Sequence, residues 1–270
     1  MSERASHGAE APEPFDDHGP QLPVEPPADP GHPLRTYVAL YPEVARAGSL
    51  QNALQAVIDR AGPGLTVELT SSPGWRYVAA KSETDSRSAN VLMAKDERHF
   101  SVECWARNVH MASGGTQDLS EVAGAMRSWH EGSTVRALTT QWPFLRTWEL
   151  AEAHECGEAV PARWEMMRRP AAARGGRGRD TEWQDLVQAA FEQPRLRALS
   201  PGRSLYWFTL SRRAAPPICS DLPRTRPLGN GRFEVTCADG RVQEVDGAAA
   251  TAAVIVDNLP DDAVPQPVTP

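Results

Sequence analysis

Five arginines in the last third of the chain could together bind an anion. Arg195 and Arg197 follow Pro194, and three more, Arg203, Arg212 and Arg213, flank the apolar segment 204–211. A guanidinium group holds a carboxylate or a phosphate through two parallel hydrogen bonds, so arginines that converge on one point form an anion site. Scattered surface positions are the alternative, and the sequence leaves open whether the arginines converge. We select Arg197 and Arg212, together with the neighbouring Ser211, as candidate ligand-binding residues.

A second group of candidates is aromatic. A run of rings could line a pocket for a flat ligand, although packing in a core is the commoner use of such residues. The run consists of Trp142, Phe144, Trp148, Trp164 and Trp183. From it we take Trp142 and Trp164 as candidate ligand-binding residues.

Nucleophilic and metal chemistry has less support. The chain contains no GxxxxGK[ST], GxGxxG, GxSxG or HExxH motif, and its four cysteines are at least 18 positions apart. His154 could pair with Cys104, Cys219 or Cys237 as a nucleophile and its base. We instead interpret His154 as a solvated helix residue, and Cys104 and Cys237 as core residues of strands. We therefore expect no metal and no cofactor, and we favour a non-catalytic role while leaving enzymatic activity open.

The elements that position these residues follow from hydrophobic periodicity, caps and turns. In the second half we expect a helix over 149–167 that Pro161 could kink, a helix capped by Thr181, a strand over 204–213, a hairpin with a type I′ turn at Asp239-Gly240, and a helix over 248–259. In the first half, Ser49 caps a helix and a second helix lies within 118–132. Between them we expect strands over 65–70, 75–81, 90–95 and 99–107, followed by an irregular link over 109–115.

Strands gather in groups that helices separate, and no βαβ unit repeats. This order predicts an α+β fold in which antiparallel strand meanders are closed by helices, in two similar-sized halves. We place an N-terminal subdomain at 34–140 and a C-terminal subdomain at 141–260. The flanking segments 1–33 and 261–270 are expected to be disordered tails.

Charge is unevenly distributed along the chain. Residues 1–33 hold seven acids, one base and eight prolines, a composition typical of disorder, whereas the body of the chain is almost neutral. A neutral body makes nucleic-acid binding unlikely, because such binding needs a concentrated basic face. The glycine- and arginine-rich segment 168–180 is interpreted as a solvated loop.

Two further features concern localisation and origin. The sequence has no apolar run of about 18 residues and no apolar N-terminal signal, so we expect a soluble cytoplasmic protein without membrane contact. Only two lysines accompany 26 arginines, and alanine, glycine and proline are abundant. This bias indicates a bacterial genome of high GC content.

The second half resembles a known family. Over 141–260 the segments QWPFL, ELAEAHECGEAVPARWEMM, LVQAAFEQPRLRALSPGRSLYWFTLSR, GRFEVT and AAATAAVIVDNLP are similar to a bacterial "natural product biosynthesis protein" family, domain of unknown function 6193. SPGRS at 200–204 departs from it, because members usually carry a more apolar segment there. The single residues that match are Trp164, Pro194, Leu196, Arg197, Ser204, Ser211, Arg212, Leu259 and Pro260. The resemblance implies an association with secondary-metabolite gene clusters but no activity and no catalytic residue.

Three functions are compatible with these observations. The first is an accessory or binding protein of a biosynthetic cluster, with a protein or peptide partner. The second is an enzyme of such a cluster that acts on an anionic or peptide substrate through an arginine-lined pocket. The third is an immunity-like protein that neutralises a toxin or product. We favour the first.

Overall fold

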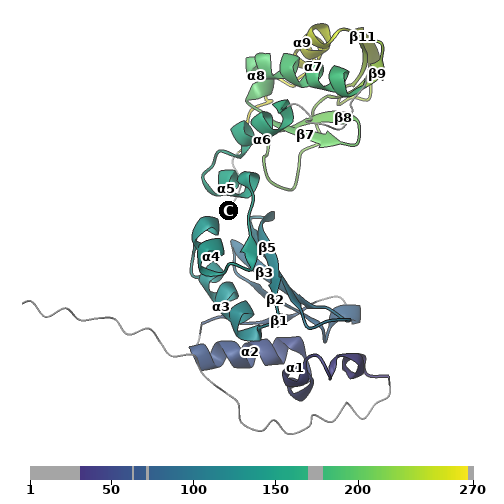
Figure 1. The fold of residues 1–270 in the computed structure, drawn as a ribbon. Coiled ribbons are helices and arrows are strands. Elements are labelled where there is room, and N and C mark those ends of the chain that lie inside the picture. Colours follow the sequence, from purple (N-terminus) through teal and green to yellow (C-terminus); the bar gives the residue numbers. More distant parts are fainter. Residues whose placement is uncertain (1–30, 63, 71–72, 170–178, 267–270) are drawn as a thin grey trace, which may run out of the picture.

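The computed structural model describes residues 31–62, 64–70, 73–169 and 179–266. Most of the acidic segment 1–33 and of the segment 168–180 therefore lies outside the described residues. Within the described part, helices accompany two separate antiparallel sheets, one of six strands and one of five. This arrangement confirms the α+β fold class predicted from the sequence (Figure 1).

The first part of the chain builds the six-stranded sheet, whose order β1-β2-β3-β4-β5-β6 follows the sequence. Consecutive strands pair antiparallel, as short connections require. Helices α2 and α3 supply much of the buried apolar surface that packs with the strands. The strands are β1 (Glu68–Leu69), β2 (Ala79–Glu83), β3 (Arg87–Met93), β4 (Phe100–Ala106), β5 (Val109–Thr116) and β6 (Leu145–Arg146), and the helices are η1 (Pro33–Tyr37), α1 (Pro42–Ala47), α2 (Leu50–Ala61), η2 (Pro73–Trp75), α3 (Leu119–His130) and α4 (Val135–Gln141).

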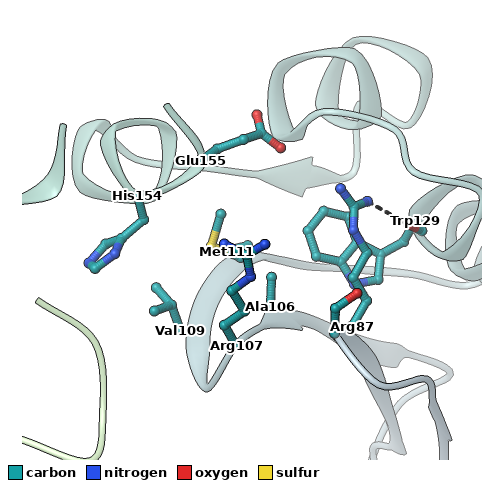
Figure 2. Close-up of a pocket in the computed structure, with 9 residues that line it drawn as sticks. Arg87, Ala106, Arg107, Val109, Met111, Trp129, His154 and Glu155 are labelled. Carbon is teal, nitrogen blue, oxygen red and sulfur yellow. Dashed lines mark hydrogen bonds between the residues drawn. The ribbon is translucent and has the colours of Figure 1, made fainter. Parts of the chain in front are cut away.

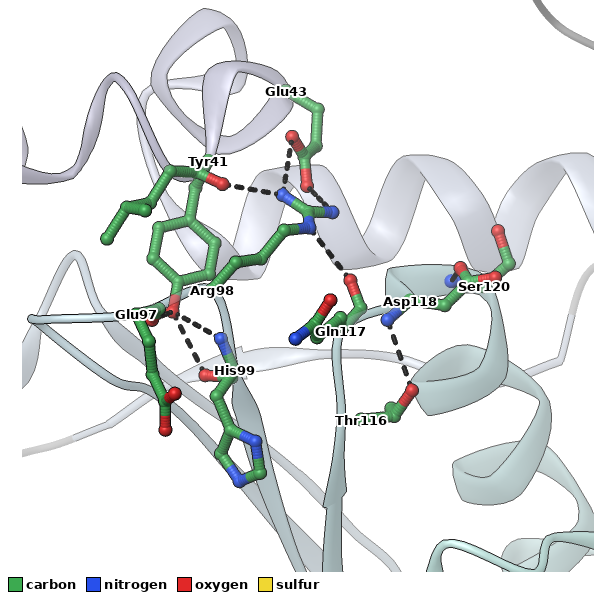
Figure 3. Close-up of polar contacts among 10 residues, drawn as sticks. Tyr41, Glu43, Glu97, Arg98, His99, Thr116, Gln117, Asp118 and Ser120 are labelled. Carbon is green, nitrogen blue, oxygen red and sulfur yellow. Dashed lines mark hydrogen bonds and ion pairs between the residues drawn. The ribbon is translucent and has the colours of Figure 1, made fainter.

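A polar cluster ties α1 to this sheet (Figure 3). Arg98 binds both carboxylate oxygens of Glu43 and donates to the carbonyls of Leu40 and Gln117. The buried Tyr41 hydroxyl accepts from the His99 amide at 2.9 Å and lies within hydrogen-bond distance of three backbone carbonyls. Burial is the main cause that raises the pKa of Tyr41, so the ring remains a neutral donor.

Several predictions for this part need correction. The expected strands 65–70 and 75–81 are shorter, because only 68–69 and 79–83 pair with neighbours. The expected irregular link 109–115 is strand β5, and it brings the buried Met111 and Ala112 into the core. Its glycines masked the strand pattern, but Gly114 is required there, because a Cβ atom would overlap the backbone of Phe144.

Two short helices lead from the first part of the chain to the second. They are α5 (Glu149–Glu155) and α6 (Ala159–Arg168), and Figure 1 shows them between the two sheets. The single helix expected over 149–167 is therefore wrong. The break falls at Gly157, which has a φ of +79°, and Pro161 instead lies in the first turn of α6, where a missing N–H costs little.

The second part of the chain builds the five-stranded sheet, in the order β11-β10-β9-β8-β7. Helices α7 and α9 share a buried apolar core with one face of the sheet, and this core is separate from the first one. No helix of the described segments has both the length and the apolar character needed to cross a membrane. The strands are β7 (Ser200–Ser204), β8 (Trp207–Ser211), β9 (Arg224–Gly229), β10 (Arg232–Thr236) and β11 (Val242–Asp246), and the helices are α7 (Arg179–Glu192), α8 (Pro194–Arg197) and α9 (Ala248–Asp257).

The strand expected over 204–213 is two strands. β7 and β8 form a hairpin whose tip is Leu205, with a φ of +55°, and Tyr206. The sequence predicts no strand over SPGRS, yet this segment is an edge strand, where a proline is tolerated because its missing N–H can face away from the neighbouring strand. The hairpin of β10 and β11 is confirmed, but its turn is not type I′, since only Gly240 of the Asp239-Gly240 pair takes a positive φ.

Candidate functional site

One end of the six-stranded sheet holds a cavity of about 270 Å³ (Figure 2). Strands β4 and β5 reach it through a tight turn at Arg107 and Asn108, with φ of +49° and +63°. Positive φ at both turn residues matches the twist of the paired strands and fixes the turn geometry. The turn brings Arg107 to the cavity, opposite the side chains that α5 contributes.

Arg87, at the start of β3, is held rigidly in the wall of this cavity. Its Nη1 donates to the carbonyls of Trp129 at 2.6 Å and Ser133 at 2.8 Å. The guanidinium carbon lies 4.0 Å from the centroid of the Trp129 ring, a cation–π contact. Because Trp129 is fully buried, Arg87 has a fixed position and presents a pre-organised charge.

Helix α5 supplies His154 and Glu155 to the same cavity. Both carboxylate oxygens of Glu155 accept from the amide of Val135 at 3.1 Å, so this carboxylate is already engaged. Glu155 also interacts electrostatically with Arg87, whose pKa is lowered mainly by burial. Among the residues that line the cavity, two arginines therefore face one carboxylate. Val109 and Met111 add an apolar wall.

His154 and Arg163 leave buried nitrogens without partners. Nε2 of His154 and Nε of Arg163, on α6, are both inaccessible to solvent and have no hydrogen-bond partner in the described part of the chain. Burial, followed by the charge of Arg163, lowers the pKa of His154 to about 4. Burial also lowers the pKa of Arg163. Unsatisfied buried donors are rare in folded proteins and often mark the place of a missing ligand or water.

The lowered pKa of His154 predicts a pH-dependent stability. An ordinary histidine titrates near 6.5, so between pH 6.5 and about 4 the unfolded chain binds a proton that folded His154 does not. The free energy of unfolding should therefore fall as the pH falls through this window. Since the ring is only half-buried, we expect a loss of about 1–2 kcal/mol from this residue, less than the full shift implies.

Urea denaturation at a series of pH values measures this effect, with His154→Gln as the comparison. The variant should lose part of the acid sensitivity but not all of it, because burial and Arg87 also lower the pKa of His130. Identical pH profiles for the two proteins would show that His154 is not protected from protonation in the folded state.

The five candidates selected from the sequence lie elsewhere, and none of them lines this cavity. Trp142 packs in the first core and donates from Nε1 to Ser128 Oγ at 3.1 Å. Trp164 lies in the second core, 1% exposed, and donates to the Leu199 carbonyl at 3.0 Å. Both indoles are thus satisfied structural residues.

The other three candidates also have structural partners. Arg197 is exposed, with its guanidinium carbon 5.4 Å from the Phe191 ring centroid. Arg212 is 7% exposed and pairs with Asp221 and Asp262 at 2.9 Å each, while Ser211 Oγ accepts two backbone amides. The two arginines share no partner, so the structure does not bring them together on one anion. Asp262, which forms one of these ion pairs, lies in the segment 261–270 that the sequence predicts to be a disordered tail.

The sequence interpretation missed Arg87, Arg107 and Glu155, and it assigned His154 to solvent. Half-burial in the cavity corrects the assignment of His154. The hypothetical Cys104–His154 nucleophile pair finds no support, since burial raises the pKa of Cys104 to about 12. The described residues include no group of three or more His, Cys, Asp or Glu side chains that could hold a metal.

Comparison with known proteins gives one finding. Residues 158–269 match the sequence model of a family of unknown function, DUF6193, which confirms the resemblance of the C-terminal segment to that family. No curated protein and no solved structure matches the chain. All residues that line the cavity described above precede the matched segment.

Proposed function

We propose that this protein is a non-catalytic binding protein that holds a small anionic molecule in the cavity between Arg87, Arg107 and His154. The observation that carries the proposal is the imbalance of charge and hydrogen bonding there. Two arginines line the cavity with one carboxylate, and that carboxylate already accepts a backbone amide. A bound anion would supply the acceptors that the site lacks.

The positions of the cations suit this role. Arg87 is fixed by two carbonyls and the Trp129 ring, so little entropy is lost when it receives a ligand. The side chain of Arg107 has no hydrogen bond or ion pair with any described residue and can turn toward an incoming anion. Val109 and Met111 would contact a small apolar part of the ligand.

The size of the cavity limits the ligand. A volume of about 270 Å³ lies near the lower end of the range of small-molecule sites. This space suits a carboxylate or phosphate with a short apolar substituent and is too small for a nucleotide.

Inorganic phosphate and acetate are suitable probes, with the unfolding temperature as the readout. Ligand that binds only the folded state raises this temperature, and the rise grows with the logarithm of the ligand concentration once that concentration exceeds the Kd. We expect at least one probe to stabilise the protein, and Arg107→Ala to weaken that binding about tenfold or more, the loss typical of one charge-assisted hydrogen bond. Arg232→Ala, which removes an exposed arginine of β10 paired with Glu244, is the matched control and should bind like the wild type.

Two results would overturn the proposal. One is an unfolding temperature that neither probe changes at millimolar concentration. The other is equal weakening by Arg107→Ala and Arg232→Ala, which would indicate a general charge effect rather than a site.

We further propose that this binding serves natural-product biosynthesis in a high-GC bacterium, alongside a protein or peptide partner of the same pathway. The resemblance of the sequence over 141–260 and the strong preference for arginine over lysine support this context. Purification of the tagged full-length chain from a producing strain, followed by mass spectrometry, tests it. Recovery of neither a pathway protein nor a pathway metabolite would contradict it.

An enzyme acting on an anionic substrate is the second candidate, and one observation favours it. With a pKa near 4, His154 is neutral at pH 7 and lines the cavity, so its imidazole is in the protonation state of a general base for a bound substrate. This alternative expects turnover of a pathway intermediate that His154→Gln abolishes while binding of the intermediate persists. Binding without turnover would leave the non-catalytic function in place.

A further inference from the structure

A second cavity, of about 500 Å³, lies on the five-stranded sheet. Helices α7 and α9 pack against the opposite face, where Phe208, Phe233 and Val235 are buried. The first cavity is built from residues 86–155, and no residue lines both. The second cavity is therefore an independent feature of the molecule.

The floor of this second cavity is a row of polar side chains across three strands. Thr236 pairs with Arg224, and Phe208 pairs with Thr225, so Thr209 lies beside Arg224 on the adjacent strand. Side chains alternate between the faces of a strand, which places Thr209, Arg224 and Thr236 together on the face opposite the core. Ser204, at the end of β7, adds another hydroxyl group.

The wall of the cavity comes from the loop between β8 and β9, which contributes Ile218, Cys219 and Leu222. Ser211 and Arg212 anchor this loop. Ser211 Oγ accepts from the amide of Cys219 at 3.1 Å, and Arg212 pairs with Asp221 at 2.9 Å. Two residues selected from the sequence as ligand contacts are thus positioning residues for the wall of a cavity.

Arg224 stands out among the arginines of this face. Its guanidinium carbon lies 4.5 Å from the Trp207 ring centroid, and the group has no carboxylate or hydrogen-bond partner among the described residues. The guanidinium carbon of Arg226, two positions along the same strand, lies 4.8 Å from the centroid of the same ring, but Arg226 is paired with Glu234. Arg224 is therefore an oriented cation with its hydrogen-bonding capacity unused.

We propose that the cavity over β8, β9 and β10 is a second ligand site, which binds a monocarboxylate with an apolar body. Arg224 would receive the carboxylate through paired N–H···O bonds. The apolar body would lie against Ile218 and Leu222, and the hydroxyls of Thr209 and Thr236 would accept or donate to polar atoms of the ligand. Ile218 is 48% exposed in the free protein, and contact with such a ligand would cover it.

The position of the second cavity in the sequence also supports a ligand site. Every residue that lines the second cavity falls within the segment 158–269 that matches the family. A site shared by members of that family must lie within the matched segment, and this cavity meets that condition whereas the first one does not.

Cysteine alkylation tests the proposal on the full chain with octanoate as the probe. Cys219 lines the cavity, while Cys156 is exposed in the turn between α5 and α6 and serves as an internal control. We expect octanoate to slow the reaction of iodoacetamide with Cys219 and to leave the reaction rate at Cys156 unchanged. Peptide mass spectrometry measures both rates. Octanol, which has the same chain without the charge, should protect about tenfold less effectively.

Variants then locate the carboxylate contact. Arg224→Gln should raise the octanoate concentration needed for protection about tenfold, and Arg232→Gln on the neighbouring strand should not. Ile218→Asp, which places a like charge in the wall at an exposed position, provides a second variant and should also weaken protection. Phosphate binding at the first cavity should be unchanged in all three, so the two sites are tested separately. Equal protection by octanol and octanoate, or no protection of Cys219 at millimolar octanoate, would overturn the proposal.

Discussion

Replacement of Trp164 by alanine is expected to lower the free energy of unfolding by about 3–5 kcal/mol, the range for removal of a large buried aromatic side chain. Trp164 is 1% exposed and its ring centroid lies 5.6 Å from that of Phe191 and 6.0 Å from that of Phe208. Alanine would leave a cavity at the centre of the second core and the Leu199 carbonyl without its indole donor. Urea denaturation followed by circular dichroism measures the change.

Trp148→Ala is the matched control for that experiment. Trp148 is 36% exposed and makes an edge contact with His110, so its removal should cost less than about 1 kcal/mol. If Trp164→Ala kept the stability of the wild type but lost a ligand, Trp164 would be a pocket residue, as the sequence alone allows. The pair of variants thus separates the two uses of tryptophan that composition cannot distinguish.

Local signals in the sequence predicted the parts of the fold that depend on local interactions. Ser49, the predicted helix cap, accepts a backbone amide at the start of α2, and the helix expected within 118–132 is α3. The hairpin of β10 and β11 follows from alternation on both sides of a turn. These features need no knowledge of distant contacts, so they can be found without a structure.

The features that were missed depend on contacts between distant segments. The glycines of β5 look like a loop until the backbone of Phe144 is seen to pass beside Gly114. By contrast, SPGRS pairs with the adjacent β8, and it is missed because proline and glycine are uncommon in strands. A single sequence cannot show which segment will be a neighbour.

The candidate site was missed for the same reason. Arg87, Arg107 and His154 come from β3, a turn and α5, and nothing in their spacing distinguishes them from surface residues. Arginine is common throughout the chain, so the residue type alone does not distinguish the arginines of the cavity from those of the surface. In the second half, the sequence directed attention to Ser211 and Arg212, which the structure places behind the wall of a cavity rather than within it.

Replacement of Arg163 by methionine is expected to have opposite effects on stability and on anion binding. Arg163 has a buried Nε without a partner, and the described residues provide no ion pair for its charge. Methionine keeps an unbranched apolar side chain at this position and removes the cost of the unpaired charge, so the free energy of unfolding should rise by about 0.5–2 kcal/mol. Urea denaturation without added anion measures this gain.

Under the proposed function, the same replacement should weaken phosphate or acetate binding several-fold, because a positive charge close enough to lower the pKa of His154 also attracts an anion in the cavity that His154 lines. Binding is measured above pH 7, where His154 is neutral in both proteins, since loss of Arg163 lets the pKa of His154 rise. Arg169→Met, at the end of the same helix, is the control. Arg169 forms an exposed ion pair with Glu149, so its replacement should change neither the stability nor the anion binding by much. If the variant were more stable but bound anions as well as the wild type does, the charge of Arg163 would not serve anion binding. Loss of stability together with loss of binding would mean that Arg163 supports the fold rather than a ligand. Stability gained as binding is lost is the pattern of a residue kept for a ligand, because selection for folding alone would remove a half-buried cation whose Nε has no partner.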